Sequence, residues 1–126
     1  MVLHPTAVIS PSARIGAVTV VFARTVVNAN TGVGENCIIN TGATVDHDCT
    51  IEDHANVAPG CNIAGTVAVG VGALVGIGSC VIQEVRLGAW CTLGAGTVAT
   101  EDVQASTTVV DVPARVSSSM SDNSVR

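Results

Sequence analysis

The chain has 126 residues, 48% of them hydrophobic and only 12% charged, with 13 Gly, one Trp, one Phe and no Tyr. This length suits one domain, whose core has to be built from small aliphatic side chains rather than rings. A net charge of -5 with only 5 Lys+Arg cannot neutralise a run of phosphates, so we expect neither nucleic acid nor an anionic membrane as a partner.

The amino terminus, MVLHPTAVIS, has no basic segment and no sustained apolar run. No secretory signal is predicted, and a cytoplasmic location is the expectation. Residues 54–83 contain no Asp, Glu, Lys or Arg, which a hydropathy window would score as a transmembrane helix. The stretch is rich in Gly and keeps a period of six, which argues against any helix.

An aliphatic residue occupies every sixth position from Ile9 to Leu93, and a small or compact residue lies two positions before each. A six-residue unit with two inward side chains fits a short strand followed by a corner, and three units close one triangular coil of 18 residues. The 84 residues from 9 to 93 give between four and five such coils, stacked at ~4.8 Å. The sequence therefore predicts an all-β fold, a parallel β-helix of about five triangular coils.

The outward positions of this helix are largely uncharged. Val18, Val20, Thr44 and Ala68 would be exposed to water on a monomer. Side-by-side oligomerisation is the simplest way to cover them.

Four of the five cysteines, Cys37, Cys49, Cys61 and Cys91, occupy the small inward position, where we expect them to act as spacers. Those that share a column lie three coils apart, too far for a disulfide. Unpaired buried thiols suit a reducing compartment. No CxxC or Cys/His spacing of a zinc site appears, so no metal is expected.

One corner carries an unusual cluster of polar residues, Asp46, His47 and Asp48, directly below Gly65 of the next coil. An adjacent carboxylate can keep one imidazole nitrogen protonated and leave the other as a general base near neutral pH. His47 is therefore a candidate catalytic residue, the alternative being a solvated surface histidine. His54 lacks the flanking carboxylates.

A second corner carries an unbroken column of glycines, Gly42, Gly60, Gly78 and Gly96. One interpretation is that each tight corner needs a positive φ. The other is that a ridge without side chains gives an extended ligand, such as a pantetheine arm, access to the backbone. The two interpretations are compatible.

Five segments together resemble one family of enzymes: IINTGATVDHDCTI, APGCNIAG, GIGSCVIQEVRLG, LGAGTVATEDV and VVDVPARV. They are similar to the carboxy-terminal domain of the sialic acid O-acetyltransferases and bacillosamine-type sugar N-acetyltransferases, which are hexapeptide-repeat acyltransferases. The resemblance runs to about Val116. It implies a left-handed β-helix over residues 1–116, acetyl-CoA as acetyl donor, and a homotrimer with sites between subunits.

The same resemblance implies roles for individual residues. His47 would deprotonate the attacking amine or hydroxyl, Asp48 would orient His47, and Asn40 would support the site. The Gly65 N–H would stabilise the oxyanion. The acetyl-CoA arm would lie along Gly76, Ile77, Gly78 and Ala95. The favoured acceptor, by analogy, is a nucleotide-linked 4-amino sugar, while a sialic acid hydroxyl or a smaller amine stays open.

Three features depart from the family pattern. Many members carry an amino-terminal, Rossmann-like sugar-binding domain, and this chain starts where that domain would end. Asp111 replaces the usual Gly of the closing motif, and Asn56 stands where some members have a second histidine. Residues 117–126, which have no apolar pattern, are predicted to be a disordered tail.

Two other functions stay open as alternatives. A γ-class carbonic anhydrase would share the helix, but it needs three histidines converging on zinc, and His4, His47 and His54 occupy different positions. A noncatalytic β-helix, either an assembly module or a truncated transferase domain, would trimerise without turnover.

Overall fold

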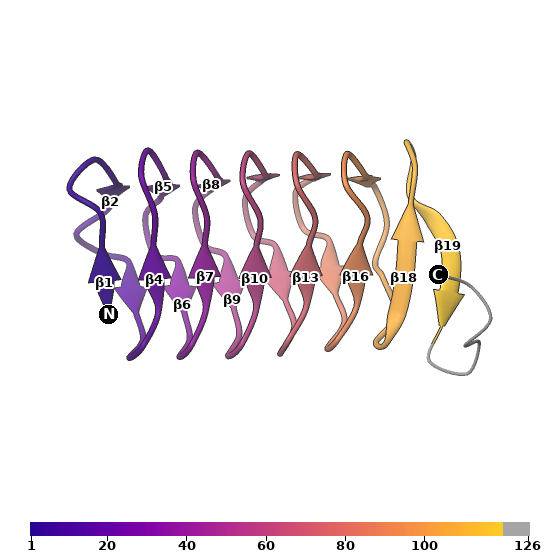
Figure 1. The fold of residues 1–126 in the computed structure, drawn as a ribbon, viewed down its shortest axis with the longest axis horizontal. Helices are drawn as coiled ribbons and strands as arrows, with labels where there is room; N and C mark the ends of the chain where they lie inside the picture. The colour runs from indigo at the N-terminus through magenta and orange to yellow at the C-terminus, as the bar shows by residue number, and fades with distance from the viewer. Residues whose placement is uncertain (120–126) are drawn as a thin grey trace.

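Two-residue strands separated by four-residue corners repeat along almost the whole chain in the computed structural model, which describes residues 1–119. Three parallel sheets result, because each strand pairs with the strand 18 residues further on, as Thr44 does with Val26 and Asn62. The turns are stacked in a row, with the amino terminus at one end and β18 and β19 at the other (Figure 1).

The strands fall into three sheets, here named A, B and C. Sheet A contains β1 (Val2–Leu3), β4 (Val20–Val21), β7 (Ile38–Ile39), β10 (Asn56–Val57), β13 (Leu74–Val75), β16 (Thr92–Leu93), β18 (Thr107–Val110) and β19 (Arg115–Ser119). Sheet B contains β2 (Val8–Ile9), β5 (Val26–Val27), β8 (Thr44–Val45), β11 (Asn62–Ile63), β14 (Cys80–Val81) and β17 (Val98–Ala99). Sheet C contains β3 (Arg14–Ile15), β6 (Gly32–Val33), β9 (Thr50–Ile51), β12 (Ala68–Val69) and β15 (Arg86–Leu87).

This arrangement confirms the predicted parallel β-helix. Sheet B contributes six strands, from β2 to β17, and each turn of the stack contains one of them. The stack thus has about six turns rather than the predicted five, because strands such as β1 and β17 extend it beyond residues 9–93. The uncharged stretch 54–83 forms β10 to β14, and no helix among residues 1–119 is long and apolar enough to cross a membrane.

The second residue of each strand points into the core, and the small position two residues earlier does too. From Val21 to Leu93 every inward aliphatic residue is at most 4% exposed. Burial of such side chains, at about 1.5–3 kcal/mol each, is the main force holding the turns together.

The small inward position has a second role that the sequence analysis missed. Hydroxyl and thiol groups there donate hydrogen bonds to the carbonyl 15 residues later, in the next turn. The donor and acceptor pairs are Thr19 to Gly34, Thr31 to Asp46, Cys37 to Glu52, Cys49 to Ala64, Cys61 to Gly76 and Ser79 to Gly94. These cysteines are therefore donors that join successive turns as well as spacers. All five cysteines are free, and burial raises the pKa of the Cys91 thiol to about 11.

An antiparallel hairpin of β18 and β19 closes the carboxy-terminal end of the stack. β18 continues sheet A by pairing in parallel with β16. β19 extends to Ser119, three residues into the segment predicted as a tail. The rest of that segment, residues 120–126, lies outside the described residues.

The three outer faces differ in charge. The outward strand residues of sheets A and B include no charged side chain before β19, whereas sheet C carries Arg14 and Arg86. Several outward residues of A and B are large and apolar, among them Val2, Val8 and Leu74, which are 63%, 64% and 39% exposed. This pattern supports the prediction that these faces are covered in an assembly.

Candidate active site

The site is built on corners that all follow one geometry. We name each corner by the two sheets that it joins, so that residues 46–48 lie on the B–C corner and residues 40–42 on the A–B corner. One residue of nearly every corner has a positive φ, whether or not it is glycine. At the B–C corner this residue is Asp48, with φ 57°.

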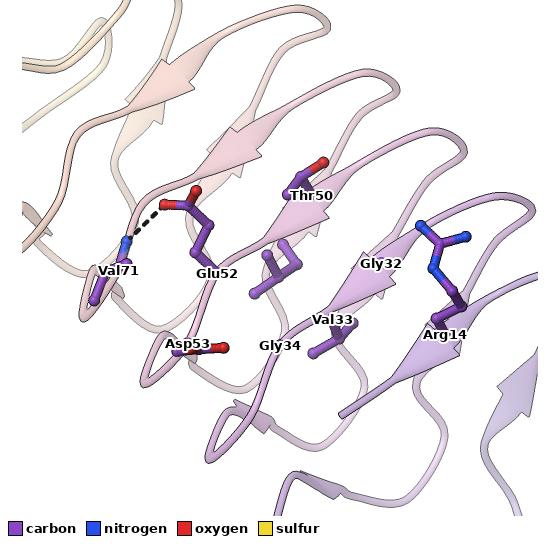
Figure 2. Close-up of a pocket in the computed structure, with 9 residues that line it drawn as sticks. Arg14, Gly32, Val33, Gly34, Thr50, Glu52, Asp53 and Val71 are labelled. Carbon is purple, nitrogen blue, oxygen red and sulfur yellow. Dashed lines mark hydrogen bonds between the residues drawn. The ribbon is translucent and has the colours of Figure 1, made fainter. Parts of the chain in front are cut away.

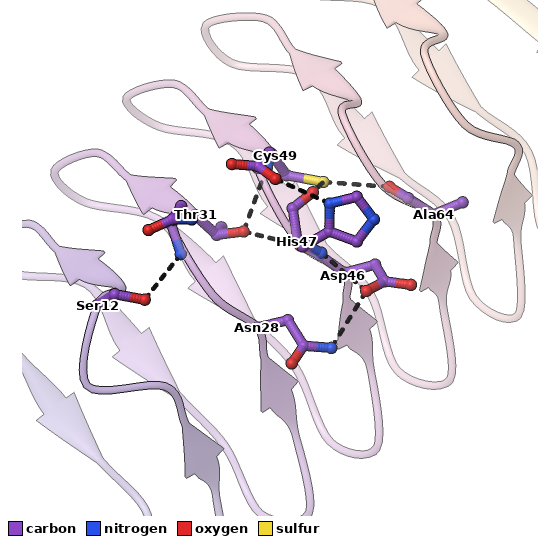
Figure 3. A network of polar contacts seen from close by, with 9 residues as sticks. Ser12, Asn28, Thr31, Asp46, His47, Cys49 and Ala64 are labelled. Carbon is purple, nitrogen blue, oxygen red and sulfur yellow. Dashed lines mark hydrogen bonds and ion pairs between the residues drawn. The ribbon is translucent and has the colours of Figure 1, made fainter.

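Asp46 holds the corner in place. Its Oδ1 accepts hydrogen bonds from the His47 N–H at 2.8 Å and from Asn28 Nδ2, in the preceding turn, at 3.2 Å. The Thr31 hydroxyl donates to the Asp46 carbonyl at 2.7 Å. Figure 3 shows this network, with the His47 ring on the surface of the corner, between Asp46 and the turn that carries Ala64.

Asp48 orients the imidazole. Its Oδ2 lies 2.9 Å from His47 Nδ1, so an ionised Asp48 accepts a hydrogen bond from Nδ1–H. The other ring nitrogen, Nε2, is then left for other partners. This hydrogen bond, together with the charges of Asp46 and Asp48, raises the pKa of His47 above its ordinary value, against the smaller opposing effect of desolvation. The two side chains are 56% and 52% exposed. The structure thus brings His47 and Asp48 together as predicted.

Gly65 lies against the open side of the ring. A Cβ at this position would sit 2.6 Å from His47 Nε2 and 2.7 Å from Cε1, so only glycine leaves the ring where it is. The Gly65 N–H also differs in its hydrogen bonding from the His47 N–H, which occupies the same position one turn earlier. Asp46 satisfies the His47 N–H, but Ala64 offers no such acceptor, and within residues 1–119 the Gly65 N–H makes no hydrogen bond. It is available to an oxyanion beside Nε2.

The glycine column of the A–B corner has positive φ throughout, with values of 70°, 71°, 69° and 69° at Gly42, Gly60, Gly78 and Gly96. This confirms the conformational interpretation. However, the same φ occurs at Thr66 (59°) and Trp90 (59°) on the other corners, so conformation alone does not require glycine.

What distinguishes the column is the space outside it. A Cβ at Gly42, Gly78 or Gly96 would meet no atom of the chain within 4 Å. The missing side chains therefore leave the corner bare toward the outside, which favours a ligand or a neighbouring chain against it. Gly76 is different, because a Cβ there would collide with the Leu93 carbonyl oxygen.

Asn40, Ile77 and Ala95 lie on this A–B corner and not beside His47. The Asn40 Oδ1 accepts the Thr41 N–H at 2.8 Å, a contact within its own corner. Ile77 is 61% exposed. A single chain therefore presents the predicted base and the predicted cofactor residues on two separate corners, as expected from their positions in the repeat.

The sequence analysis missed two residues that support the site, Asn28 and Thr31. Both were detectable in principle: Asn28 lies 18 residues before Asp46 in the same column, and Thr31 lies 15 residues before it in the donor position described above.

Two surface pockets among the described residues are lined by neither His47 nor Asp48. One, of about 400 Å³, lies on sheet C and its corner; Figure 2 shows Arg14 on one side of it and Glu52 and Asp53 on the other. The second, of about 340 Å³, lies under the carboxy-terminal hairpin. Within residues 1–119, no group of three or more His, Cys, Asp or Glu side chains could hold a metal ion.

Comparison with known proteins places this geometry in a family. The profile of the bacterial transferase hexapeptide (six repeats) matches residues 30–65. A histidine-to-alanine variant of GDP-perosamine N-acetyltransferase from Caulobacter crescentus, in complex with CoA and GDP-perosamine, is 40% identical with a TM-score of 0.91, over 94% of this chain and 57% of that one. No curated protein sequence matches the chain significantly.

Two more solved structures share the fold. The acetyltransferase domain of PglB from Neisseria gonorrhoeae, in complex with acetyl coenzyme A, is 38% identical with a TM-score of 0.90, over 90% of this chain and 56% of that one. AntD, an N-acyltransferase from Bacillus cereus, is only 14% identical with a TM-score of 0.87, over 93% of this chain and 78% of that one, and shows the fold alone.

The chain spans a little over half the length of the two more similar structures, 57% and 56%. Over that span the repeat, the stacked turns and the sequence identity all agree. The chain therefore belongs to the hexapeptide-repeat acyltransferase family.

Proposed function

We propose that the chain is an acetyl-CoA-dependent acetyltransferase that N-acetylates an amino sugar, with a nucleotide-linked 4-amino sugar as the acceptor. The observation that carries this proposal is the His47 ring, held at Nδ1 by Asp48 at 2.9 Å with Nε2 against Gly65. The 40% identical protein crystallised with CoA and GDP-perosamine supports both the donor and the class of acceptor.

The arrangement supplies the two functions that direct acyl transfer needs. Nε2 of neutral His47 takes the proton of the amine as its nitrogen forms a bond to the thioester carbon. The Gly65 N–H donates to the oxygen that gains charge in the tetrahedral intermediate. When the C–S bond breaks, His47 returns the proton to the departing CoA sulfur. Asp48 accepts the hydrogen bond from Nδ1–H, so that proton stays on the ring, and the carboxylate stabilises the transient imidazolium.

The donor would lie along the glycine column. Gly78 gives its pantetheine arm a close approach to the backbone, and the exposed side chain of Ile77 together with Ala95 would lose water to the arm. Gly76 contributes by letting the next turn, which contains Leu93 and Gly94, pack closely against it. These residues keep the cofactor roles that the family resemblance implies, as proposals.

A homotrimer completes the site. His47 and the glycine column lie on different corners, and the uncharged faces of sheets A and B meet at the A–B corner. Rotation about a three-fold axis keeps equivalent turns at the same height, so Asn40 and the column of one subunit can face His47 of the next. Light scattering tests this point, with a mass of three chains as the expected result.

Charge at the B–C corner favours an amine acceptor. Asp46, Asp48 and Glu84 lie on this corner, and among residues 1–119 it carries no Arg or Lys. Such a corner attracts an ammonium group and repels the carboxylate of a sialic acid. A 4-amino sugar therefore fits better than a sialic acid hydroxyl. With acetyl-CoA as donor and five free thiols, a cytoplasmic location completes the proposal.

The test is release of CoA thiol in the presence of matched acceptors. We expect turnover with a nucleotide-linked 4-amino sugar and none with sialic acid or with the 4-hydroxy sugar nucleotide. Binding of acetyl-CoA is measured on the same sample, since a saturating ligand at ~100 times its Kd stabilises the native state by about 2.7 kcal/mol. A confirmed trimer that shows no such stabilisation would favour the noncatalytic assembly module instead.

A further inference from the structure

The A–B corner carries charge at its two ends and nowhere between them. Arg24 precedes Gly42 in the glycine column, and the turns from Asn40 to Gly96 contribute only uncharged residues to the corner. Beyond Gly96 come Asp111, in the connection between β18 and β19, and Arg115, the first residue of β19. A ligand lying along the column thus meets charge only where the column ends.

Strand pairing and a hydrogen bond place Asp111 one turn beyond residues 95–97 of the A–B corner. In the regular stack, the N–H that opens a sheet B strand donates to the carbonyl of the next turn, as Cys80 does to Thr97 at 2.9 Å. At the last turn Val98 donates in the same way to Asp111, at 3.1 Å. The φ of Asp111 is also positive, at 79°. Asp111 therefore places a charged side chain on the A–B corner, one turn beyond the last glycine of the column.

Arg115 is paired with this side chain. Its Nε donates to Asp111 Oδ2 at 2.6 Å, and the two side chains are 78% and 52% exposed. Exposed pairs of this kind contribute little to stability, so the guanidinium can exchange one anionic partner for another. The backbone around it is held in place, because the Ala114 N–H donates to the Val98 carbonyl at 2.8 Å.

The length and direction of the column indicate which part of a donor would arrive there. Gly42 and Gly96 are three turns apart, which at ~4.8 Å per turn is ~14 Å, a length that an extended pantetheine arm can span. Gly42 is level with the turn that carries His47, where a thioester has to lie. Toward the amino terminus, the side chains of Phe22 and Arg24 end the bare surface after one turn. The arm therefore runs toward Asp111.

We propose that Asp111 and Arg115 form an anion-exchange pair that sets the affinity for the phosphate groups of CoA. Arg115 leaves Asp111 and binds a phosphate through its planar guanidinium, while Asp111 competes for Arg115 and repels the same phosphate. The pair therefore weakens binding of the phosphorylated end without affecting the pantetheine arm. This inference rests on the proposed acetyl-CoA-dependent function.

The test compares Asp111→Asn and Arg115→Ala with the unaltered chain. Asn adopts the required conformation at Asn30 and Asn36, with φ 60° and 53°, so the first substitution removes charge with little strain. By calorimetry at low salt, Asp111→Asn is expected to tighten the Kd for CoA roughly 3- to 10-fold, and Arg115→Ala to weaken it by a similar factor. Both effects should shrink in 0.5 M salt.

Uncharged pantetheine, followed by NMR titration, separates a phosphate effect from a damaged hairpin. Neither variant should change its affinity. Glu35→Gln, on the corner between sheets C and A, and Arg86→Ala, on sheet C, remove the same charges from parts of the surface outside the proposed site. Both should leave CoA binding within twofold of the unaltered chain.

Two results would overturn the inference alone: CoA affinities that do not change in the variants, or equal losses for CoA and pantetheine. If the unaltered chain binds neither ligand as a confirmed trimer, the proposed function fails and takes this inference with it.

Discussion

At the scale of single residues, the proposed proton transfer depends on the protonation state of His47. The hydrogen bond that His47 donates to Asp48 raises the pKa of His47, and the base has to be neutral to accept a proton. Activity should therefore fall as the pH drops through this raised pKa. In Asp48→Asn the pKa is lower, so the acid limb of the kcat/KM profile should move to lower pH, and the plateau should fall because the imidazolium is no longer stabilised. Glu84→Gln, one charge on the same corner, serves as the control; a limb that stays in place or moves to higher pH would contradict the account.

Gly65 provides a second test at this scale. In Gly65→Ala the new Cβ would lie 2.6 Å from Nε2, so the ring has to swing away from the oxyanion donor. A misplaced base is expected to cost ~100-fold in kcat, with acetyl-CoA affinity and thermal midpoint nearly unchanged. Gly32→Ala, on sheet C, is the matched control, because its Cβ would meet only the flexible end of Arg14, at 3.2 Å. Equal activity in both variants would exclude a fixed position for the ring.

The sequence predicts those contacts of the site that join residues adjacent in the chain or 18 residues apart. His47, Asp48 and Gly65 were identified because neighbours in sequence, or residues 18 apart, are neighbours in this fold. The unbound N–H of Gly65 depends on the absence of an acceptor at Ala64, and the link from Thr31 crosses 15 residues. Such details depend on how side chains point at the corners, which a period does not specify.

At the scale of elements, the hydroxyl and thiol donors of the small inward position contribute to stability. The Thr31 hydroxyl donates to the Asp46 carbonyl and accepts the Cys49 N–H at 3.2 Å. Thr31→Val keeps the shape but leaves two buried backbone groups unpaired, so we expect a loss of about 1–3 kcal/mol in the free energy of unfolding. Thr31→Ser should retain most of the stability. Denaturant titration measures both, and equal stability of the Val and Ser variants would show that packing alone matters here.

The glycine column can be tested without straining the corner. Gly78→Asn places a side chain in open space at a φ that Asn adopts elsewhere in the chain. We expect a folded trimer with acetyl-CoA affinity reduced ~10-fold or more, because the arm loses its close approach to the backbone. His54→Asn places Asn at φ 64° on the corner between sheets C and A, away from both the column and His47, and should bind normally. Normal binding by Gly78→Asn would restrict the column to a conformational role.

The regular elements were predictable and the closing hairpin was not. Every strand from β2 to β16 follows the six-residue period, because each turn repeats the same inward pair. β18 and β19 leave that period: the chain shortens the last corner, reverses at Asp111 and pairs antiparallel. For this reason Arg115–Ser119 is a strand although its sequence has no apolar pattern.

At the scale of the whole molecule, the proposed assembly of three chains explains both the uncharged sheet faces and the separation of His47 from the glycine column. The base lies on one corner and the bare column on another, with only uncharged sheet faces beside the column. In the proposed homotrimer, three copies related by rotation would bring the two corners together. Stability and catalysis then depend on the same contact surfaces, so dissociation into single chains should abolish both acetyl-CoA binding and turnover.

The most direct measurement is acetyl transfer by His47→Ala compared with the unaltered chain, with acetyl-CoA affinity determined on the same trimeric samples. Loss of a general base is expected to lower kcat by ~100- to 10,000-fold, while the Kd for acetyl-CoA stays within about twofold because the column lies on another corner. Equal turnover by the two proteins, or an unaltered trimer that binds acetyl-CoA but acetylates no amino sugar, would contradict the central claim.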